Sequence, residues 1–166
     1  MESSRRFFLS VGSNIDRARN LKEAIRRLRQ HGHVQRISDV WESHAVGSEG
    51  PDYLNICVEF IAPLSREELK RGIVGRIETE LGRARTADKN SPRTIDIDIL
   101  MEGGQPMNLD RWDYAFVVVP MADLLPEWPH PISGKPLEQE ANNARASTWL
   151  RRRSEILLEA AGSGES

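Results

Sequence analysis

The sequence predicts an α+β fold whose elements follow the order of a ferredoxin-like split unit. Segments with a period of two, typical of strands buried on one face, alternate with segments whose apolar residues recur every three or four positions, typical of helices. The resulting order is strand, helix, strand, strand, helix, strand. The 166 residues, 39% of them hydrophobic, suffice for one domain with a sizeable core. We expect that domain over residues 1–161 and a flexible tail over 162–166.

Three segments in the first half of the chain alternate and are predicted strands: Arg6–Val11, Val34–Glu42 and Tyr53–Ala62. Two helices are predicted from capping boxes, Asn20 with Glu23 and Ser65 with Glu68. The second helix carries an apolar residue at every fourth position: Leu69, Ile73, Ile77 and Leu81. Towards the end of the chain, Glu138–Ala161 is predicted to be helical.

The last strand of the unit, Ile95–Leu100, carries the strongest chemical signal. Its isoleucines would face the core, and Asp96 and Asp98 would share the other face with Cα atoms roughly 7 Å apart. Two such carboxylates can bind one divalent cation or bridge two, and Mg²⁺ is usually completed by substrate phosphates. The alternative is an edge strand with solvated carboxylates, because a bare D-x-D motif often occurs by chance.

Arginines precede this strand in a segment rich in turn-forming residues. Arg83, Arg85 and Arg93 are ordinary surface charges on the simplest interpretation. However, guanidinium groups bind phosphate oxygens bidentately and offset the charge that develops in phosphoryl transfer. Arginines together with a metal ion would make a phosphoryl-transfer site.

Three motifs of the sequence resemble those of a known protein family and occur in the same order as in that family. The stretch PRTIDIDIL, with GRAR ten residues before it, resembles the signature of the 6-hydroxymethyl-7,8-dihydropterin pyrophosphokinases of folate biosynthesis. The segment FLSVGSN, followed by Asn20-Leu21, is similar to that family's first strand and turn, and PDYLN to its pterin-binding segment. The resemblance covers about residues 6–128 and implies one pyrophosphokinase-like domain. Its fold would be a mainly antiparallel sheet of about six strands with helices on both faces.

The resemblance also implies a reaction and a set of site residues. Pyrophosphate would pass from MgATP to 6-hydroxymethyl-7,8-dihydropterin, releasing AMP. Asp96 and Asp98 would hold two Mg²⁺ ions, while Arg83 and Arg93 would stabilise charge on the transferring group. The pterin pocket would consist of Gly12, Val46, Tyr53, Asn55 and Phe116. The nucleotide, as co-substrate, would be bound by Glu78, Arg85 and Arg111.

The sequence departs from the family's pattern in three places. The segment before Phe116 is about eight residues short, lacks the phosphate-binding histidine and has Tyr114 in place of an arginine. Either Arg111 or Tyr114 could take over the lost phosphate contacts. Asn90 stands where a tryptophan often covers the pterin, and His44 where the family usually has proline. Beyond Phe116 the family continues with a V-x-x-P-like strand, which here would be the run Val117–Pro120.

Two other functions remain open from the residues. The shortened segment favours a divergent paralogue that binds a pterin or uses another phosphate donor. The arginine segment could instead serve a ferredoxin-like RNA-binding module. Against RNA binding stand the net charge of −2 and the lack of paired aromatic residues on a strand.

The composition also indicates the compartment and the partners that we expect for the protein. The only cysteine, Cys57, cannot form an internal disulfide, which fits a reducing compartment, and the cytoplasm is the expected location. No apolar run approaches the roughly 20 residues of a membrane span, and the N-terminus has no signal-peptide pattern. We expect small-molecule substrates, no nucleic acid, no membrane and no obligatory protein partner.

Overall fold

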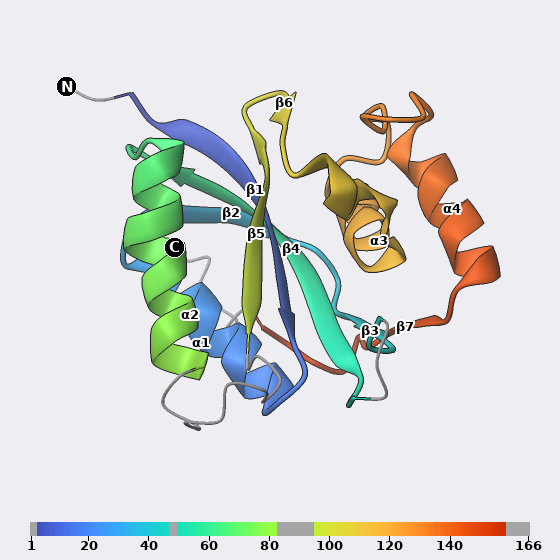
Figure 1. Cartoon of the computed structure of the whole chain (residues 1–166), viewed down its shortest axis with the longest axis horizontal. Coiled ribbons are helices and arrows are strands. Elements are labelled where there is room, and N and C mark those ends of the chain that lie inside the picture. Colours follow the sequence, from blue (N-terminus) through green and yellow to red (C-terminus); the bar gives the residue numbers. More distant parts are fainter. Residues whose placement is uncertain (1–2, 47–49, 83–94, 159–166) are drawn as a thin grey trace.

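An antiparallel sheet with helices on both faces organises the protein (Figure 1). The structure is a computed structural model that describes residues 3–46, 50–82 and 95–158. Its strands are ordered β6-β5-β1-β4-β3-β7, and β2 also pairs with β4. The strands are β1 (Arg5–Ser13), β2 (His33–Ile37), β3 (Trp41–Ser43), β4 (Tyr53–Ala62), β5 (Asp96–Glu102), β6 (Gln105–Pro106) and β7 (Leu150–Arg152). The helices are α1 (Arg17–Arg29), α2 (Gly75–Gly82), α3 (Ala115–Leu124) and α4 (Leu137–Ser147).

Strand alternation divides the interior into two cores. Leu9 and Val11 of β1 face the core beneath α1 and α2, as do all three isoleucines of the segment 95–99. Phe8 and Cys57 face the second core, which α3 and α4 cover. In Figure 1 the two helix pairs accordingly lie on opposite sides of the sheet. The predicted α+β fold with helices on both faces is therefore confirmed.

The helix predicted from Ser65 is present, but its first half has an unusual conformation. Its capping box is formed, since the Ser65 N–H donates to Glu68 Oε1 at 2.8 Å and the Glu68 N–H to Ser65 Oγ at 3.1 Å. Residues Glu68–Val74 are π-helical and α2 continues from Gly75. In an α-helix, a stripe spaced by four residues would rotate by about 40° per repeat. The wider π turns reduce that rotation, and Ile73 and Ile77 stay buried against the sheet.

The prediction of one strand over Val34–Glu42 is wrong, because the chain bends between β2 and β3. At the bend, Ser38 replaces part of the ladder: its N–H donates to the Cys57 carbonyl and its Oγ accepts from the Cys57 N–H, both at 2.9 Å. The predicted start of α1 at Asn20 is also wrong. Helix α1 begins at Arg17, and Asn20 lies inside its first turn, donating to the Ile15 carbonyl at 2.6 Å.

Two predictions for the last third of the chain are wrong as well. The run Val117–Pro120 lies in helix α3. A short run of apolar residues cannot be assigned to strand or helix by periodicity, and here the second core surrounds it. Of the described part of the predicted helix Glu138–Ala161, residues 138–158, only the stretch up to Ser147 is helical. Strand β7 follows it and pairs with the edge of β3. Residues 159–166, including the predicted tail, lie outside the described residues.

In the described part of the chain, no helix has the length and apolar character needed to cross a membrane.

Candidate active site

Three adjacent strands bring the predicted metal ligands next to the predicted pterin-binding residues. In the sheet register, Gly12 of β1 stands between Asp96 of β5 and Asn55 of β4. Two pairs along, Asp98 stands opposite Ser10. Because alternate residues of a strand share a face, Asp96, Asp98, Gly12 and Asn55 all project from the same face of the sheet. The period of two in the sequence is therefore what assembles the site.

A small cavity of about 180 Å³ opens on this face. All five residues predicted for the pterin pocket line it, namely Gly12, Val46, Tyr53, Asn55 and Phe116. Asp96, Asp98 and Arg111 complete the wall at one end. Sequence reasoning missed four lining residues, Ser10, Ser43, His44 and Ala45. Of these, Ser10 could have been found from its position two residues before Gly12 on the same strand.

Asn55 is held so that its oxygen faces the cavity. The side chain is 2% exposed, and Nδ2 donates to the Trp41 carbonyl at 3.1 Å and to Ser43 Oγ at 2.8 Å. A carbonyl can only accept, so the nitrogen must face Trp41 and the oxygen must point the other way. A Cβ on Gly12 would lie 3.0 Å from that oxygen. Glycine at position 12 thus leaves space in front of an acceptor atom in a buried pocket.

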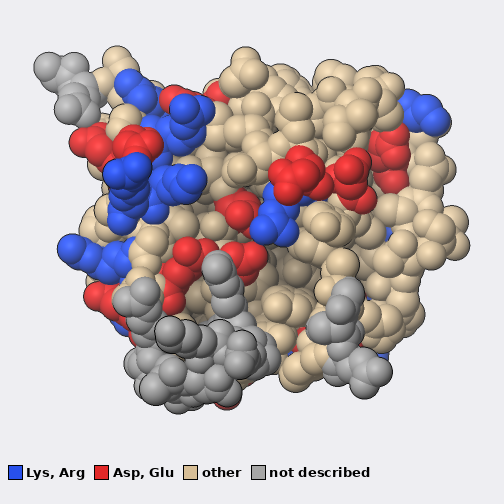
Figure 2. Space-filling model, viewed as in Figure 1, with Lys and Arg blue, Asp and Glu red and all other residues tan. Residues whose placement is uncertain are grey.

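A large groove of about 760 Å³ adjoins the other side of the aspartate pair. It shares Asp96, Asp98 and Arg111 with the small cavity and extends along the π-helical segment, where Arg66, Lys70 and Arg71 line it. Figure 2 shows basic side chains gathered at the upper left, over the start of this helical segment. The groove therefore combines cations at one end with carboxylates at the junction of the two spaces.

Glu78 and Arg111 hold the junction from two sides. Oε2 of Glu78 accepts from the Ile97 N–H at 2.8 Å, which ties α2 to β5 between the two aspartates. Glu78 also lines the large groove. Nε of Arg111 lies 3.4 Å from Oδ2 of Asp98. Arg111 lies in a short 3₁₀ segment after β6, Leu109–Asp113, and lines the large groove together with Asp96 and Asp98.

Of the two candidates for the lost phosphate contacts, the geometry favours Arg111. Tyr114 stacks on Phe116, with ring centroids 5.0 Å apart, and lines neither the small cavity nor the large groove. His130 is buried away from both, with Nε2 2.7 Å from the Trp112 carbonyl and Nδ1 accepting from the N–H groups of Ile132 and Ser133. His130 therefore holds a turn and does not replace the family's missing histidine.

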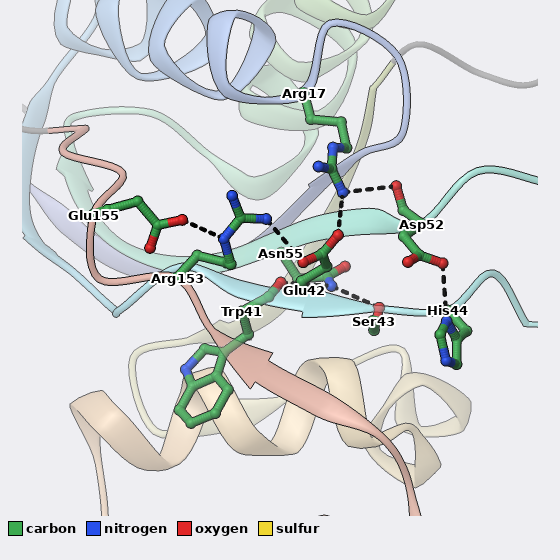
Figure 3. A network of polar contacts seen from close by, with 9 residues as sticks. All are labelled: Arg17, Trp41, Glu42, Ser43, His44, Asp52, Asn55, Arg153 and Glu155. Atoms are coloured by element: carbon green, nitrogen blue, oxygen red, sulfur yellow. Dashed lines mark hydrogen bonds and ion pairs between the residues drawn. The ribbon is translucent and has the colours of Figure 1, made fainter.

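A partly buried ion network centred on Glu42 supports β3, whose Ser43 lines the small cavity (Figure 3). Glu42 of β3 accepts from Arg17 through Oε2 and from Arg153 through Oε1, both at 2.8 Å. Burial raises the pKa of the Glu42 carboxyl, but the hydrogen bonds from Arg17 and Arg153 outweigh it, and the net pKa lies below the usual value. Arg17 also donates to the carbonyl of Asp52, whose carboxylate lies 2.9 Å from Nδ1 of His44. No local sequence pattern indicates this network, because its members are far apart in the chain.

The donor set at the aspartate pair fits magnesium better than a transition metal. The pair offers only hard carboxylate oxygens, and among the described residues no group of three or more His, Cys, Asp or Glu side chains could form a closed cage. Two carboxylates beside a large groove suit an ion that is completed by water and phosphate oxygens. The predicted residues Arg83, Arg85 and Arg93 lie outside the described residues, as does Asn90.

Comparisons with known proteins bear on the family to which the chain belongs. The family model for 7,8-dihydro-6-hydroxymethylpterin-pyrophosphokinase (HPPK) matches residues 8–126. The 2-amino-4-hydroxy-6-hydroxymethyldihydropteridine pyrophosphokinase of Aquifex aeolicus is 33% identical over 144 residues, covering 80% of this chain and 88% of that protein. The protein of the same name from Synechocystis is 36% identical over 114 residues, which are 64% of this chain and 57% of that protein.

Solved structures agree on the fold. A crystal structure of Plasmodium falciparum HPPK-DHPS matches with a TM-score of 0.68 and 10% sequence identity, over 86% of this chain and 46% of that one. At this identity the match concerns the fold alone. The match to the family model, together with the Aquifex relative, shows that the chain belongs to the 7,8-dihydro-6-hydroxymethylpterin-pyrophosphokinase family.

Proposed function

We propose that the protein transfers pyrophosphate from MgATP to 6-hydroxymethyl-7,8-dihydropterin, giving the pterin diphosphate and AMP in folate biosynthesis. The proposal rests on one observation: the small cavity and the large groove meet at Asp96 and Asp98. Asn55 and Phe116 line the small cavity, and Glu78 lines the large groove. A two-substrate transfer needs this arrangement, because both reactants must reach the same point in fixed orientation.

On the acceptor side, the small cavity fits a flat heteroaromatic ring with polar edges. Phe116 and Tyr53 supply aromatic surface, and the buried Asn55 oxygen would accept from a ring N–H. Ligands that lack such a donor would leave this oxygen unpaired, which is costly in a buried site. The hydroxymethyl group would then point towards Asp96 and Asp98, which line the same cavity.

On the donor side, the large groove would take ATP with its phosphates at the junction. Asp96 and Asp98 would hold Mg²⁺, two ions on the family's pattern, which supply positive charge to offset that of the phosphates and of the acceptor oxygen. Arg111 already lies at this point and would bind a phosphate oxygen. Arg83, Arg85 and Arg93 would add further guanidinium groups for the transferring group.

One observation favours a second function, a paralogue that binds the pterin but uses a different donor. In the described part of the chain, the shortened segment before Phe116 brings only one cation, Arg111, to the junction. Each missing charged contact to phosphate would cost about 1.5–3 kcal/mol, or roughly a tenfold to a hundredfold loss of affinity.

AMP release from MgATP, measured with and without 6-hydroxymethyl-7,8-dihydropterin, tests both proposals. Calorimetric titration of each ligand on the same sample separates binding from chemistry. Pterin-dependent AMP formation at an ordinary enzymatic rate supports the transferase. Pterin binding without AMP formation or ATP binding contradicts it and favours the paralogue.

A further inference from the structure

The segment Trp149–Arg153 comes from outside the region that the family model matches, yet it lies beside the small cavity. The model match ends at residue 126, and this segment follows helix α4. Its strand β7 pairs with β3 so that Leu150 stands opposite Ser43 and Arg152 opposite Trp41. β3 is three residues long and is held by β4 on one side and by β7 on the other. The position of β3 therefore depends on the end of the chain.

At one end of this segment, Trp149 holds the wall of the small cavity. Its ring stacks on His44 with centroids 4.3 Å apart and an interplanar angle of 12°. Nδ1 of His44 is in turn 2.9 Å from the Asp52 carboxylate, to which it donates. His44 thus has one ring face and one ring atom fixed, and it begins the stretch 44–46 that lines the cavity. Trp149 remains 42% exposed, so the stack covers only part of its ring.

At the other end, Arg153 holds the strand that orients Asn55. Its guanidinium donates to Glu42, and its N–H donates to the Val40 carbonyl at 2.8 Å. The neighbours of Glu42 in β3 are Trp41 and Ser43, whose carbonyl and hydroxyl oxygens accept the two hydrogen bonds from Asn55. Figure 3 shows Arg153 and Arg17 approaching Glu42 from two sides while Asn55 lies between Trp41 and Ser43.

We propose that Trp149 is a positioning residue for the acceptor, because its stack on His44 fixes the 44–46 wall of the small cavity. In this protein His44 stands where the family usually has proline, and the stack with Trp149 supplies the restraint that a proline ring would supply. Trp149 does not line the small cavity itself, so it acts through the residues that do. This inference rests on the proposed function, since it names the acceptor as a pterin.

The experiment compares Trp149→Ala, Trp149→Phe and His44→Ala with the unchanged protein in two measurements. The first is calorimetric titration with 6-hydroxymethyl-7,8-dihydropterin and, separately, with MgATP. The second is hydrogen exchange of the backbone amides of residues 43–46 without ligand, which needs no activity. Ile132→Ala is the matched control, because Ile132 is an exposed apolar residue that lines neither the small cavity nor the large groove.

Trp149→Ala is expected to weaken pterin binding on the order of threefold to tenfold, to leave MgATP binding unchanged and to speed exchange over 43–46. Trp149→Phe, which can still stack, should restore both readouts. The double variant with His44→Ala should bind pterin no more weakly than the weaker single variant, because the two rings act as a unit. Unchanged pterin affinity and unchanged exchange in Trp149→Ala would overturn the inference. So would equal losses of pterin and ATP affinity that Trp149→Phe does not restore.

The two proposals fail in different ways. If the unchanged protein does not bind the pterin, the proposed function fails, and the exchange rates alone decide whether Trp149 holds the wall. If Trp149→Ala does not fold, His44→Ala removes the same stack from the other side. Slower or unchanged exchange in that variant then counts against the inference, and faster exchange supports it.

Discussion

Asp98 and Arg111 pair across the junction of the small cavity and the large groove, with Nε and Oδ2 3.4 Å apart. Both side chains are partly exposed, so the pair itself adds little to stability. The pair instead holds the Arg111 guanidinium at the point where phosphate oxygens would bind. Binding of a cation to the carboxylate would release Arg111 to the phosphates without moving its backbone.

Replacing Asp98 with Ala should lower transferase activity by a factor on the order of a hundred or more while changing the free energy of unfolding by less than about 1 kcal/mol. The carboxylate is a proposed metal ligand, and its ion pair is weak. Steady-state AMP release and thermal unfolding measure the two effects. Asp110→Ala, at an exposed acid of the same 3₁₀ segment as Arg111, is the control. Full activity in Asp98→Ala would refute the metal assignment.

Replacing Arg111 with Ala should weaken MgATP binding roughly tenfold to a hundredfold, since one charged hydrogen bond to phosphate is lost. The MgATP affinity of Arg111→Lys should lie between those of the unchanged protein and of Arg111→Ala, because lysine keeps the charge but lacks the planar guanidinium group. Calorimetric titration with MgATP gives the affinities. If Arg111→Ala binds MgATP as tightly as the unchanged protein, other residues hold the phosphates.

A methyl group at position 12 should selectively weaken acceptor binding. In Gly12→Ala the new Cβ would lie 3.0 Å from the Asn55 oxygen, which two hydrogen bonds from the amide nitrogen prevent from moving away. We expect a loss of pterin affinity on the order of tenfold with MgATP affinity unchanged. Gly72→Ala is the control, because its Cβ would meet open space. Equal pterin affinity in both variants would mean that the ligand does not use this oxygen.

The partly buried ion network should make stability depend on pH. The pKa of Glu42 is lower in the folded protein than in the unfolded chain, so its contribution is fully present above the unfolded pKa and is lost as the pH falls through the folded pKa. Glu42→Gln should cost on the order of 1–3 kcal/mol at neutral pH, and the difference from the unchanged protein should shrink on acidification. Urea unfolding at several pH values measures it. Glu155→Gln, which removes an exposed partner of Arg153, should change little at any pH. A pH-independent difference would contradict the network's role.

Cys57 should be inert in the folded protein. Burial, and then the charge of Asp123, raise the pKa of its thiol well above the usual value, so almost no thiolate exists at neutral pH. A thiol reagent should therefore react only after denaturant unfolds the chain. Stoichiometric labelling of the native protein at the rate of a free thiol would show that the second core opens readily.

Period-two alternation was enough to predict that Asp96 and Asp98 share a face, because strand geometry alone fixes which residues lie on one side of a sheet. Helix periodicity likewise predicted the buried stripe of Ile73 and Ile77, although not the π-helical turns that keep it aligned. The strand expected at Val117–Pro120 is a helix because surroundings decide the conformation of an apolar run. The pairing of β7 with β3 joins residues about a hundred positions apart, and no local pattern records it.

The sheet register holds Asp96, Gly12 and Asn55 in one row across three adjacent strands, so the backbone fixes their spacing. The row spans two strand spacings, roughly 10 Å, and contains no loop or hinge. Hydrogen-bonded strands therefore set the distance between Asn55, which would bind the ring edge, and Asp96, which would hold the metal. Changes in the surrounding loops would alter affinity and rate, but the paired strands would keep the spacing between these two residues.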